Sequence, residues 1–136
     1  MSKYTDKTHA EVLAQVVANG VVDDDKVSEL SDYIYADDHV DRGEFNLVVA
    51  IDNATQMNTG HSEFWPELYA DVVADYVLCD DDTPGEISEN EAAELIAAWD
   101  GDGVFSVCER AAAEVIRELA TGMPDSLEAF LTAKGV

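Results

Sequence analysis

Four segments of this chain repeat one local pattern, and that repeat constrains the fold more than any other feature of the sequence. Each segment has turn residues, then an apolar residue, then Asp or Ser, and usually Glu three positions later. This order is typical of a helix N-terminus, where the two polar side chains cap each other's backbone N–H groups. The sequence therefore predicts helix starts of one kind in segments 19–26, 37–44, 84–91 and 102–109.

The spacing of these segments repeats as well. Val22 precedes Val40 by 18 residues, and Ile87 precedes Phe105 by the same 18 residues. A fixed spacing of this kind is typical of duplicated helical units, none of which can bury its apolar face alone. We therefore expect two equivalent halves. In that frame further residues correspond, Gly20 with Gly85, Leu30 with Leu95 and Asp37 with Asp102.

Apolar residues between the helix starts follow the helical period, and no stretch keeps a two-residue alternation. The predicted fold is all-α, a compact bundle of about seven helices with internally duplicated helix–loop–helix halves. It forms a single domain over residues 1–136. The half-repeats are predicted at about 8–57 and 66–121, followed by a C-terminal helix at 125–133.

Capping residues place the individual helices. We expect N-termini at Thr8 with Glu11, near Asp24, at Asp41 with Glu44, around Pro66, at Ser88 with Glu91, at Ser106 with Glu109 and at Ser126. On the sixth helix we expect Val115, Ile116 and Leu119 to face inward. Trp65 and Trp99 are expected to pack in the core or at its rim.

Acidic residues outnumber basic residues by a wide margin. Thirty Asp and Glu face seven Lys and Arg, so the formal net charge is -23. Such a charge keeps a protein soluble, and it argues against direct binding to nucleic acid or to an anionic membrane, because phosphate contacts need Lys and Arg. Charged partners are therefore expected to be basic proteins or cations.

Membrane and export signals are missing from the sequence. No apolar run approaches the roughly 18 residues of a membrane span, and the first nine residues are polar, without a signal-peptide core. We therefore expect a cytoplasmic protein. Cys79 and Cys108 fall in apolar stretches and are too few for a disulfide framework, so both are expected to be free thiols.

One acidic loop has the ligand spacing of a calcium site. In the 12-residue EF-hand loop, oxygen ligands occupy positions 1, 3, 5, 7, 9 and 12, with Gly at position 6 and Glu at position 12. With Glu91 at position 12, Gly85 falls on position 6, and Pro84 on position 5 is the main departure. The other predicted ligands of Ca²⁺ or Mg²⁺ are Asp80, Asp82, Glu86 through its carbonyl, and Ser88.

Two further loops carry part of this pattern. The loop before Glu109 has Ala98 where the first ligand belongs, and the loop before Glu44 has Tyr at two ligand positions. In the first repeated segment Lys26 replaces the Glu, which excludes a cation site there. Helix capping alone would account for the same residues, and this interpretation stays open beside metal binding. The candidate ligands are Asp100, Asp102, Ser106 and Glu109 in one loop, and Asp37, Asp41 and Glu44 in the other.

The stretches 36–44 and 100–109 resemble the acidic helix-start motif of the TerB-like (tellurite-resistance B) family. The resemblance covers roughly residues 20–135. It implies an all-helical, internally duplicated fold whose acidic motifs bind a divalent metal. Asp38 and His39 depart from the motif, which usually has Gly there. The resemblance implies metal ligation by Asp37, Asp38, Asp41, Glu44, Asp100, Asp102, Ser106 and Glu109.

No residue pattern predicts catalysis. His9, His39 and His61 are scattered, without Cys/His metal spacing, and the chain has no nucleophile, phosphate-loop or dinucleotide motif. We therefore expect a non-enzymatic acidic helical module that binds a basic protein, with Ca²⁺ or Mg²⁺ as the only expected cofactor. The alternative is a phage-type acidic mimic of nucleic acid, such as an anti-CRISPR protein, that inhibits a basic nucleic-acid-binding protein. A hydrolase that uses carboxylates is least favoured.

Overall fold

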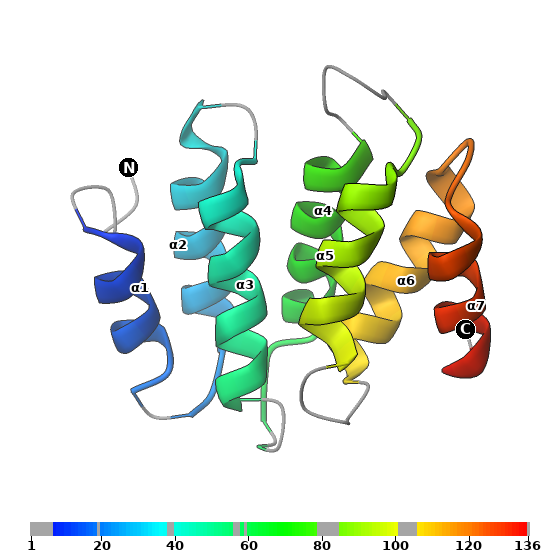
Figure 1. Cartoon of the computed structure of the whole chain (residues 1–136). Helices are drawn as coiled ribbons and strands as arrows, with labels where there is room; N and C mark the ends of the chain where they lie inside the picture. Colours follow the sequence, from blue (N-terminus) through cyan, green and yellow to red (C-terminus); the bar gives the residue numbers. More distant parts are fainter. Residues whose placement is uncertain are drawn as a thin grey trace.

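The helices begin close to the predicted capping residues (Figure 1). The computed structural model describes residues 7–18, 20–37, 40–55, 58, 60–78, 85–100 and 106–135, with Asp37 by its backbone alone. The helices are α1 His9–Val16, α2 Asp24–Ile34, α3 Arg42–Thr55, α4 Phe64–Leu78, α5 Glu89–Asp100, α6 Val107–Leu119 and α7 Asp125–Ala133, and a 3₁₀ turn, Tyr35–Asp37, follows α2. No helix in the described ranges has the length and apolar character needed to traverse a bilayer.

Four helices open with reciprocal caps that the sequence predicts, three of them in the repeated segments. In each, a side-chain oxygen of the capping residue accepts from a backbone N–H in the first turn, and Glu accepts from the backbone N–H of the capping residue. Removal of such a cap costs about 1 kcal/mol, so the caps determine locally where these helices begin. The confirmed pairs are Thr8–Glu11, Asp41–Glu44, Ser88–Glu91 and Ser106–Glu109.

Two local predictions are wrong. α7 occupies the predicted range, but Ser126 does not cap it, because Pro124 is the N-cap residue and makes no side-chain hydrogen bond there. Leu119 does not face inward and is 58% exposed. The buried stripe of α6 passes from Ile116 to the half-buried Ala120, one turn further on, so Leu119 lies beside it.

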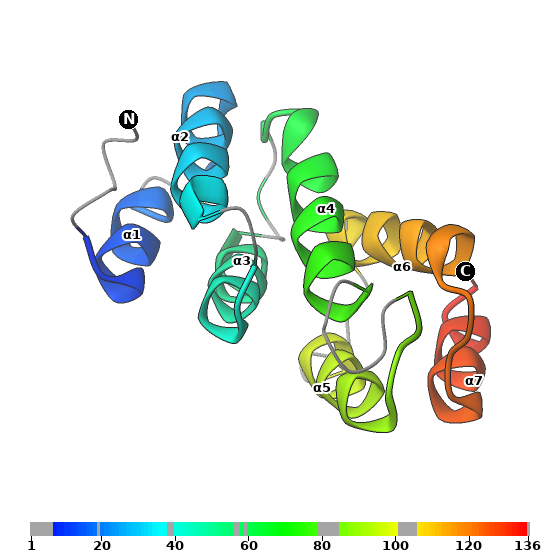
Figure 2. The ribbon, with the colours of Figure 1, turned by 90° about the horizontal axis from the view of Figure 1, so that it is seen from above.

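The chain alternates between two layers of helices (Figure 2). α2, α4 and α6 form one row, and α1, α3, α5 and α7 form the other. Within the rows α1 packs against α3, α5 against α7, and both α2 and α6 against α4. The contact of α3 with α4 joins the layers. The all-α prediction is confirmed for the described residues, whose one isolated β-bridge joins Glu86 to Gly122.

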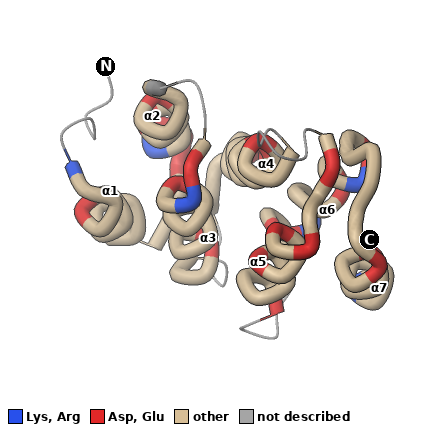
Figure 3. The backbone as a smooth tube through the Cα atoms, turned by 45° about the horizontal axis from the view of Figure 1, so that its top comes forward, with Lys and Arg blue, Asp and Glu red and all other residues tan. Residues whose placement is uncertain are grey.

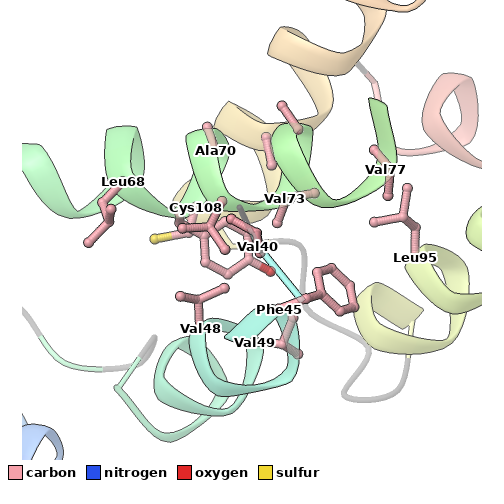
Figure 4. Close-up of a cluster of buried hydrophobic side chains, with 14 of the residues drawn as sticks. Val40, Phe45, Val48, Val49, Leu68, Ala70, Val73, Val77, Leu95 and Cys108 are labelled. Carbon is pink, nitrogen blue, oxygen red and sulfur yellow. The ribbon is translucent and has the colours of Figure 1, made fainter. Parts of the chain in front are cut away.

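The core fills the space between the layers (Figure 4). In this view Val48 and Val49 of α3 lie on one side and α4 on the other, with Leu95 of α5 close to the end of α4. Trp65 and Trp99 are 1% and 0% exposed, which confirms that they pack in the core. This packing places α4 at the centre of the molecule, in contact with α2, α3 and α6.

Corresponding positions of the two predicted halves have similar surroundings. Gly20 and Gly85 have φ angles of 74° and 79°, in the left-handed region where other residues are strained. Val22 and Ile87, two residues further on, are both buried. α1 packs on α3 in the first half as α4 packs on α6 in the second. These likenesses are what a duplication would produce, and the duplication itself stays a prediction.

Candidate functional site

The predicted metal ligands fall partly outside the described residues. Asp80, Asp82 and Asp102 lie there, as does Asp38, and of Asp37 only the backbone is described. Within the described ranges, no group of three or more His, Cys, Asp or Glu side chains is placed to hold a metal ion. Metal binding by the acidic loops therefore stays a prediction.

Most of the ligand candidates that the structure describes take part in helix caps. In each of three caps, Oε1 of the Glu accepts from the N–H of the capping residue at 2.8 to 3.0 Å, and the capping side chain accepts in return. Of the remaining candidates, Glu86 is exposed, and Oδ1 of Asp100 lies 3.7 Å from Nζ of Lys134. The structure thus brings candidates together in pairs within one cap: Asp41–Glu44, Ser88–Glu91 and Ser106–Glu109.

Lys and Arg are few along the chain (Figure 3), and two of them hold helix ends in place. Lys26, where the other repeated segments have Glu, donates to the carbonyl oxygens of Val16 at 2.9 Å and Val21 at 2.7 Å. It therefore caps the C-terminus of α1, a role that the sequence did not reveal. Arg110 of α6 donates to backbone carbonyls just beyond α7. These cations serve the fold, and the surface keeps most of its negative charge.

Polar side chains are buried where α3 meets the start of α6. Asp52 of α3 is 2% exposed, and its Oδ2 accepts from the hydroxyl of Ser106 at 2.7 Å. The backbone N–H of Ser106 also donates to Oε1 of the fully buried Glu109 at 2.8 Å. Buried carboxylates are costly unless they are hydrogen-bonded, so Ser106 secures this contact between α3 and α6. We call Asp52, Ser106, Cys108 and Glu109 the buried polar cluster.

Within this cluster Cys108 is influenced by the two carboxylates, and so is the neighbouring Tyr69. Burial raises the pKa of the Cys108 thiol, and the carboxylates of Asp52 and Glu109 raise it further. Burial and then the same two carboxylates also raise the pKa of Tyr69. Because the thiolate is the nucleophilic form, the raised pKa disfavours reaction of Cys108 near neutral pH. The predicted free, buried thiol is confirmed for Cys108, whereas Cys79 lies outside the described residues.

Cys108 is expected to resist alkylation until the protein unfolds. In a Cys79→Ser variant at pH 8, iodoacetamide should label Cys108 at least about 100-fold more slowly in the native protein than in urea, because the thiol is buried and protonated. Mass spectrometry of timed samples measures both rates. A native rate within about tenfold of the unfolded rate would contradict the prediction, because the cluster would then open readily to solvent.

His61 links two loops through its ring. Its Nδ1 accepts from the backbone N–H of Val22 at 3.0 Å, and its Nε2 lies 2.9 Å from the carbonyl oxygen of Thr55. Nε2 therefore carries the ring proton, and both nitrogens are engaged with the backbone. The ring connects the loop before α2 to the end of α3 and leaves no nitrogen available as a general base. The sequence offered no sign of this role.

A cavity of about 310 Å³ adjoins the buried polar cluster. Its polar lining includes Asp52 and Ser106, and its apolar lining includes Trp65, Pro66 and Val107. Neither Lys nor Arg is among the described residues that line it. We call it the Asp52 cavity. The cavity thus combines a buried carboxylate with apolar and aromatic side chains.

A second hollow, of about 400 Å³, lies between α4 and α6. Its floor is apolar and includes the buried Ala70 and the half-buried Ala111 and Val115. Four exposed carboxylates line its two sides, and on each helix they are four residues, or about one turn, apart. We call this hollow the α4–α6 groove and its carboxylates the acidic rims: Glu67 and Asp71 on α4, Glu114 and Glu118 on α6.

Among the described residues, no ion pair neutralises a carboxylate of the acidic rims. In the described part of the chain, the two ion pairs are Arg42–Glu94 and Lys134–Asp100, and neither involves a rim residue. The pKa of Asp71 is raised, first by partial burial and then by the charges of Asp75 and Glu67. A bound cationic group would relieve this repulsion, so the groove is suited to a basic ligand.

Comparisons with protein-family models, curated proteins and solved structures find no match to this chain. The resemblance to the TerB-like family therefore stays a prediction. The stretches that carry it contain confirmed helix caps, but unrelated helical proteins use the same caps. The function has to be inferred from the residues described above.

Proposed function

We propose that this chain is a non-enzymatic binding module that holds a basic segment of a protein partner in the α4–α6 groove. The proposal rests on one observation, an apolar floor between two acidic rims. An amphipathic helix bound in such a groove packs apolar residues on the floor. Lys or Arg spaced by one turn on that helix would match the carboxylate spacing of Glu67 and Asp71, and of Glu114 and Glu118.

Charge and side-chain chemistry support binding rather than catalysis. A net charge of -23 accelerates association with a basic partner and disfavours anionic partners. Two side chains that line the Asp52 cavity, Cys108 and His61, are poorly suited to act as nucleophile or base. Cys108 is held as the thiol, and both ring nitrogens of His61 are bound to the backbone.

Neutralising the acidic rims is expected to weaken binding of a basic helix. The probe is a labelled helical peptide with Lys one turn apart on one face and Ala and Leu on the adjoining face, measured by fluorescence anisotropy. Four exposed ion pairs contribute roughly 1–3 kcal/mol together, so we expect an affinity loss of about 10- to 100-fold. The variant carries Glu67→Gln, Asp71→Asn, Glu114→Gln and Glu118→Gln.

A matched variant separates the groove from net charge. It loses four exposed carboxylates on α2, α5 and α7 through Asp25→Asn, Asp32→Asn, Glu89→Gln and Glu128→Gln. We expect it to bind the peptide within about threefold of the wild type, since remote exposed charges are screened by salt. Equal losses in the two variants would mean that the peptide senses only total charge, and the proposal would be wrong.

A nucleic-acid mimic is the alternative, and the groove floor distinguishes it from our proposal. A mimic presents carboxylates in place of phosphates and gains little from an apolar surface. Val115→Thr keeps the shape and charge of the half-buried floor residue but adds a hydroxyl. We expect this variant to lose about two- to fivefold in peptide affinity. An unchanged affinity would favour the mimic.

Divalent-cation binding by the loop before α5 is a separate prediction. If Glu91 completes an EF-hand-like site, Glu91→Gln should lower calcium affinity at least about tenfold, because a bidentate carboxylate is lost. Gln still satisfies the helix cap, so α5 is retained. Glu11→Gln at the exposed cap of α1 is the control and should not change the affinity. Calorimetric titration of wild-type protein with millimolar Ca²⁺ and no heat would contradict the prediction.

A further inference from the structure

The geometry points to the Asp52 cavity as a receptor for one Lys or Arg side chain of the partner, with the carboxylate of Asp52 binding the ammonium or guanidinium group. This inference rests on the proposed function, because it names the partner residue that anchors the basic segment. A single buried, charged anchor of this kind dominates the specificity of many interfaces. The chemistry, shape and position of the cavity each support it.

The chemistry of the cavity is that of a cation site. Asp52 is 2% exposed, and the hydroxyl of Ser106 holds its Oδ2 at 2.7 Å, so the carboxylate is fixed in place. Glu63 also lines the cavity, and neither Lys nor Arg is among the described lining residues. The N-terminus of α6 offsets part of this negative charge. A bound ammonium or guanidinium would supply a charge-assisted hydrogen bond to Asp52.

The pKa values of two neighbouring groups, Cys108 and Tyr69, also indicate a negative environment. After burial, the carboxylates of Asp52 and Glu109 are the main causes that raise the pKa of both Cys108 and Tyr69. Both groups become anions when they lose a proton, and the negative charge of the nearby carboxylates disfavours that anionic form. The same two carboxylate charges would attract a cation in the cavity.

The shape suits the alkyl part of a long basic side chain. A volume of about 310 Å³ is at the lower end of ligand pockets, which span roughly 300–1,000 Å³, so one long side chain fits within the cavity. Trp65, Pro66 and Val107 provide apolar lining. Lys and Arg place their methylene groups against such surfaces while the charged end meets a polar partner.

The cavity continues from the α4–α6 groove. Pro66 lines both hollows, and on α6 Val107 of the cavity lies four residues, about one turn, before Ala111 of the groove. A segment lying along the groove therefore reaches the cavity at the N-terminal ends of α4 and α6. This continuity assigns the cation to the partner chain rather than to a free small molecule.

The test uses a side-chain analogue, n-propylguanidinium, and its neutral counterpart, n-butanol. In ¹⁵N NMR titrations of wild-type protein, n-propylguanidinium should give saturable shifts at the Trp65 indole and the Val107 amide. Affinity for n-butanol should be at least about tenfold weaker, because only the cation bonds Asp52. Equal affinity for the two probes, or no saturable shift with n-propylguanidinium, overturns the inference.

Substitutions at two positions locate the binding. Asp52→Asn should reduce the affinity for n-propylguanidinium at least about tenfold, while Asn still accepts from Ser106; an unchanged affinity overturns the inference. Val107 is 74% exposed, so Val107→Trp should fold normally and obstruct the cavity, whereas Val107→Ala should leave it open. If Asp52→Asn does not fold, the Val107 pair decides, because equal binding by its two members also contradicts the cavity site.

The outcomes for the cavity and for the proposed function are separable. The variant with neutralised acidic rims should bind n-propylguanidinium within about threefold of the wild type, since Asp52 is intact. Loss of peptide binding in a protein that still binds the analogue therefore concerns the groove alone. Failure of the wild type to bind the helical peptide would count against the proposed function and leave the cavity standing. Titration with putrescine tests for a free polyamine. If putrescine binds at least about tenfold more tightly than n-propylguanidinium, the cavity is a polyamine site, and the inference that a partner side chain occupies it is wrong.

Discussion

Replacement of Trp99 by alanine is expected to lower the free energy of unfolding by about 3–5 kcal/mol, the usual cost of deleting a buried aromatic side chain. Trp99 is fully buried near the end of α5, and its Nε1–H donates to the hydroxyl of Tyr69 at 3.0 Å. The substitution opens a cavity and removes that donor from a buried hydroxyl. Domains of this size are stable by about 5–15 kcal/mol, so urea denaturation should reveal a large shift.

Trp99→Phe separates packing from the hydrogen bond. The phenyl ring fills much of the site but cannot donate to Tyr69, so we expect a smaller loss of about 1–3 kcal/mol, the cost of an unsatisfied buried polar group. Trp99→Phe in a Tyr69→Phe background should cost less, because no buried hydroxyl then lacks its donor. A loss below about 1.5 kcal/mol for Trp99→Ala would contradict the prediction, because Trp99 would then have to be much less buried than the structure shows.

The helix starts could be predicted from the sequence because a cap is local. Ser88 and Glu91 are three positions apart, and their hydrogen bonds form as soon as the first turn forms. The same residues also have the spacing of calcium ligands, so the sequence cannot separate the two roles. The structure confirms the capping role for Glu44, Glu91 and Glu109. The metal role depends on loop residues outside the described ranges and stays a prediction.

The candidate binding sites could not be predicted, because they depend on residues far apart in the chain. Asp52 and Ser106 are 54 positions apart, and the groove joins α4 to α6. One signal was present: Asp52 lies four residues after Val48 on the buried stripe of α3, and a carboxylate on an apolar stripe needs a buried partner. That spacing predicts burial of Asp52, but it cannot identify Ser106 as the partner, which depends on how α3 packs against α6.

The two serine caps of the second half provide the second large expected effect. Ser88 and Ser106 cap their helices with the same pair of hydrogen bonds to Glu three positions later. Ser106 alone also donates to a buried carboxylate, that of Asp52. Ser88→Ala should therefore cost about 1 kcal/mol, the value of the cap. Ser106→Ala should cost about 2–4 kcal/mol, because a hydrogen bond to a buried charged group is lost as well.

Ser88→Ala and Ser106→Ala can be compared directly, because each removes the same kind of serine cap from the N-terminus of an α-helix. Ser106→Thr keeps the hydroxyl and should recover most of the lost stability, since Thr also caps helices well. In Asp52→Asn an uncharged amide replaces the carboxylate, so Ser106→Ala should cost about 1 kcal/mol less in that background than in the wild type. Urea midpoints of the four single variants and the double variant measure these differences. Equal costs at Ser88 and Ser106 would mean that the bond between Ser106 and Asp52 does not stabilise the contact of α3 with α6.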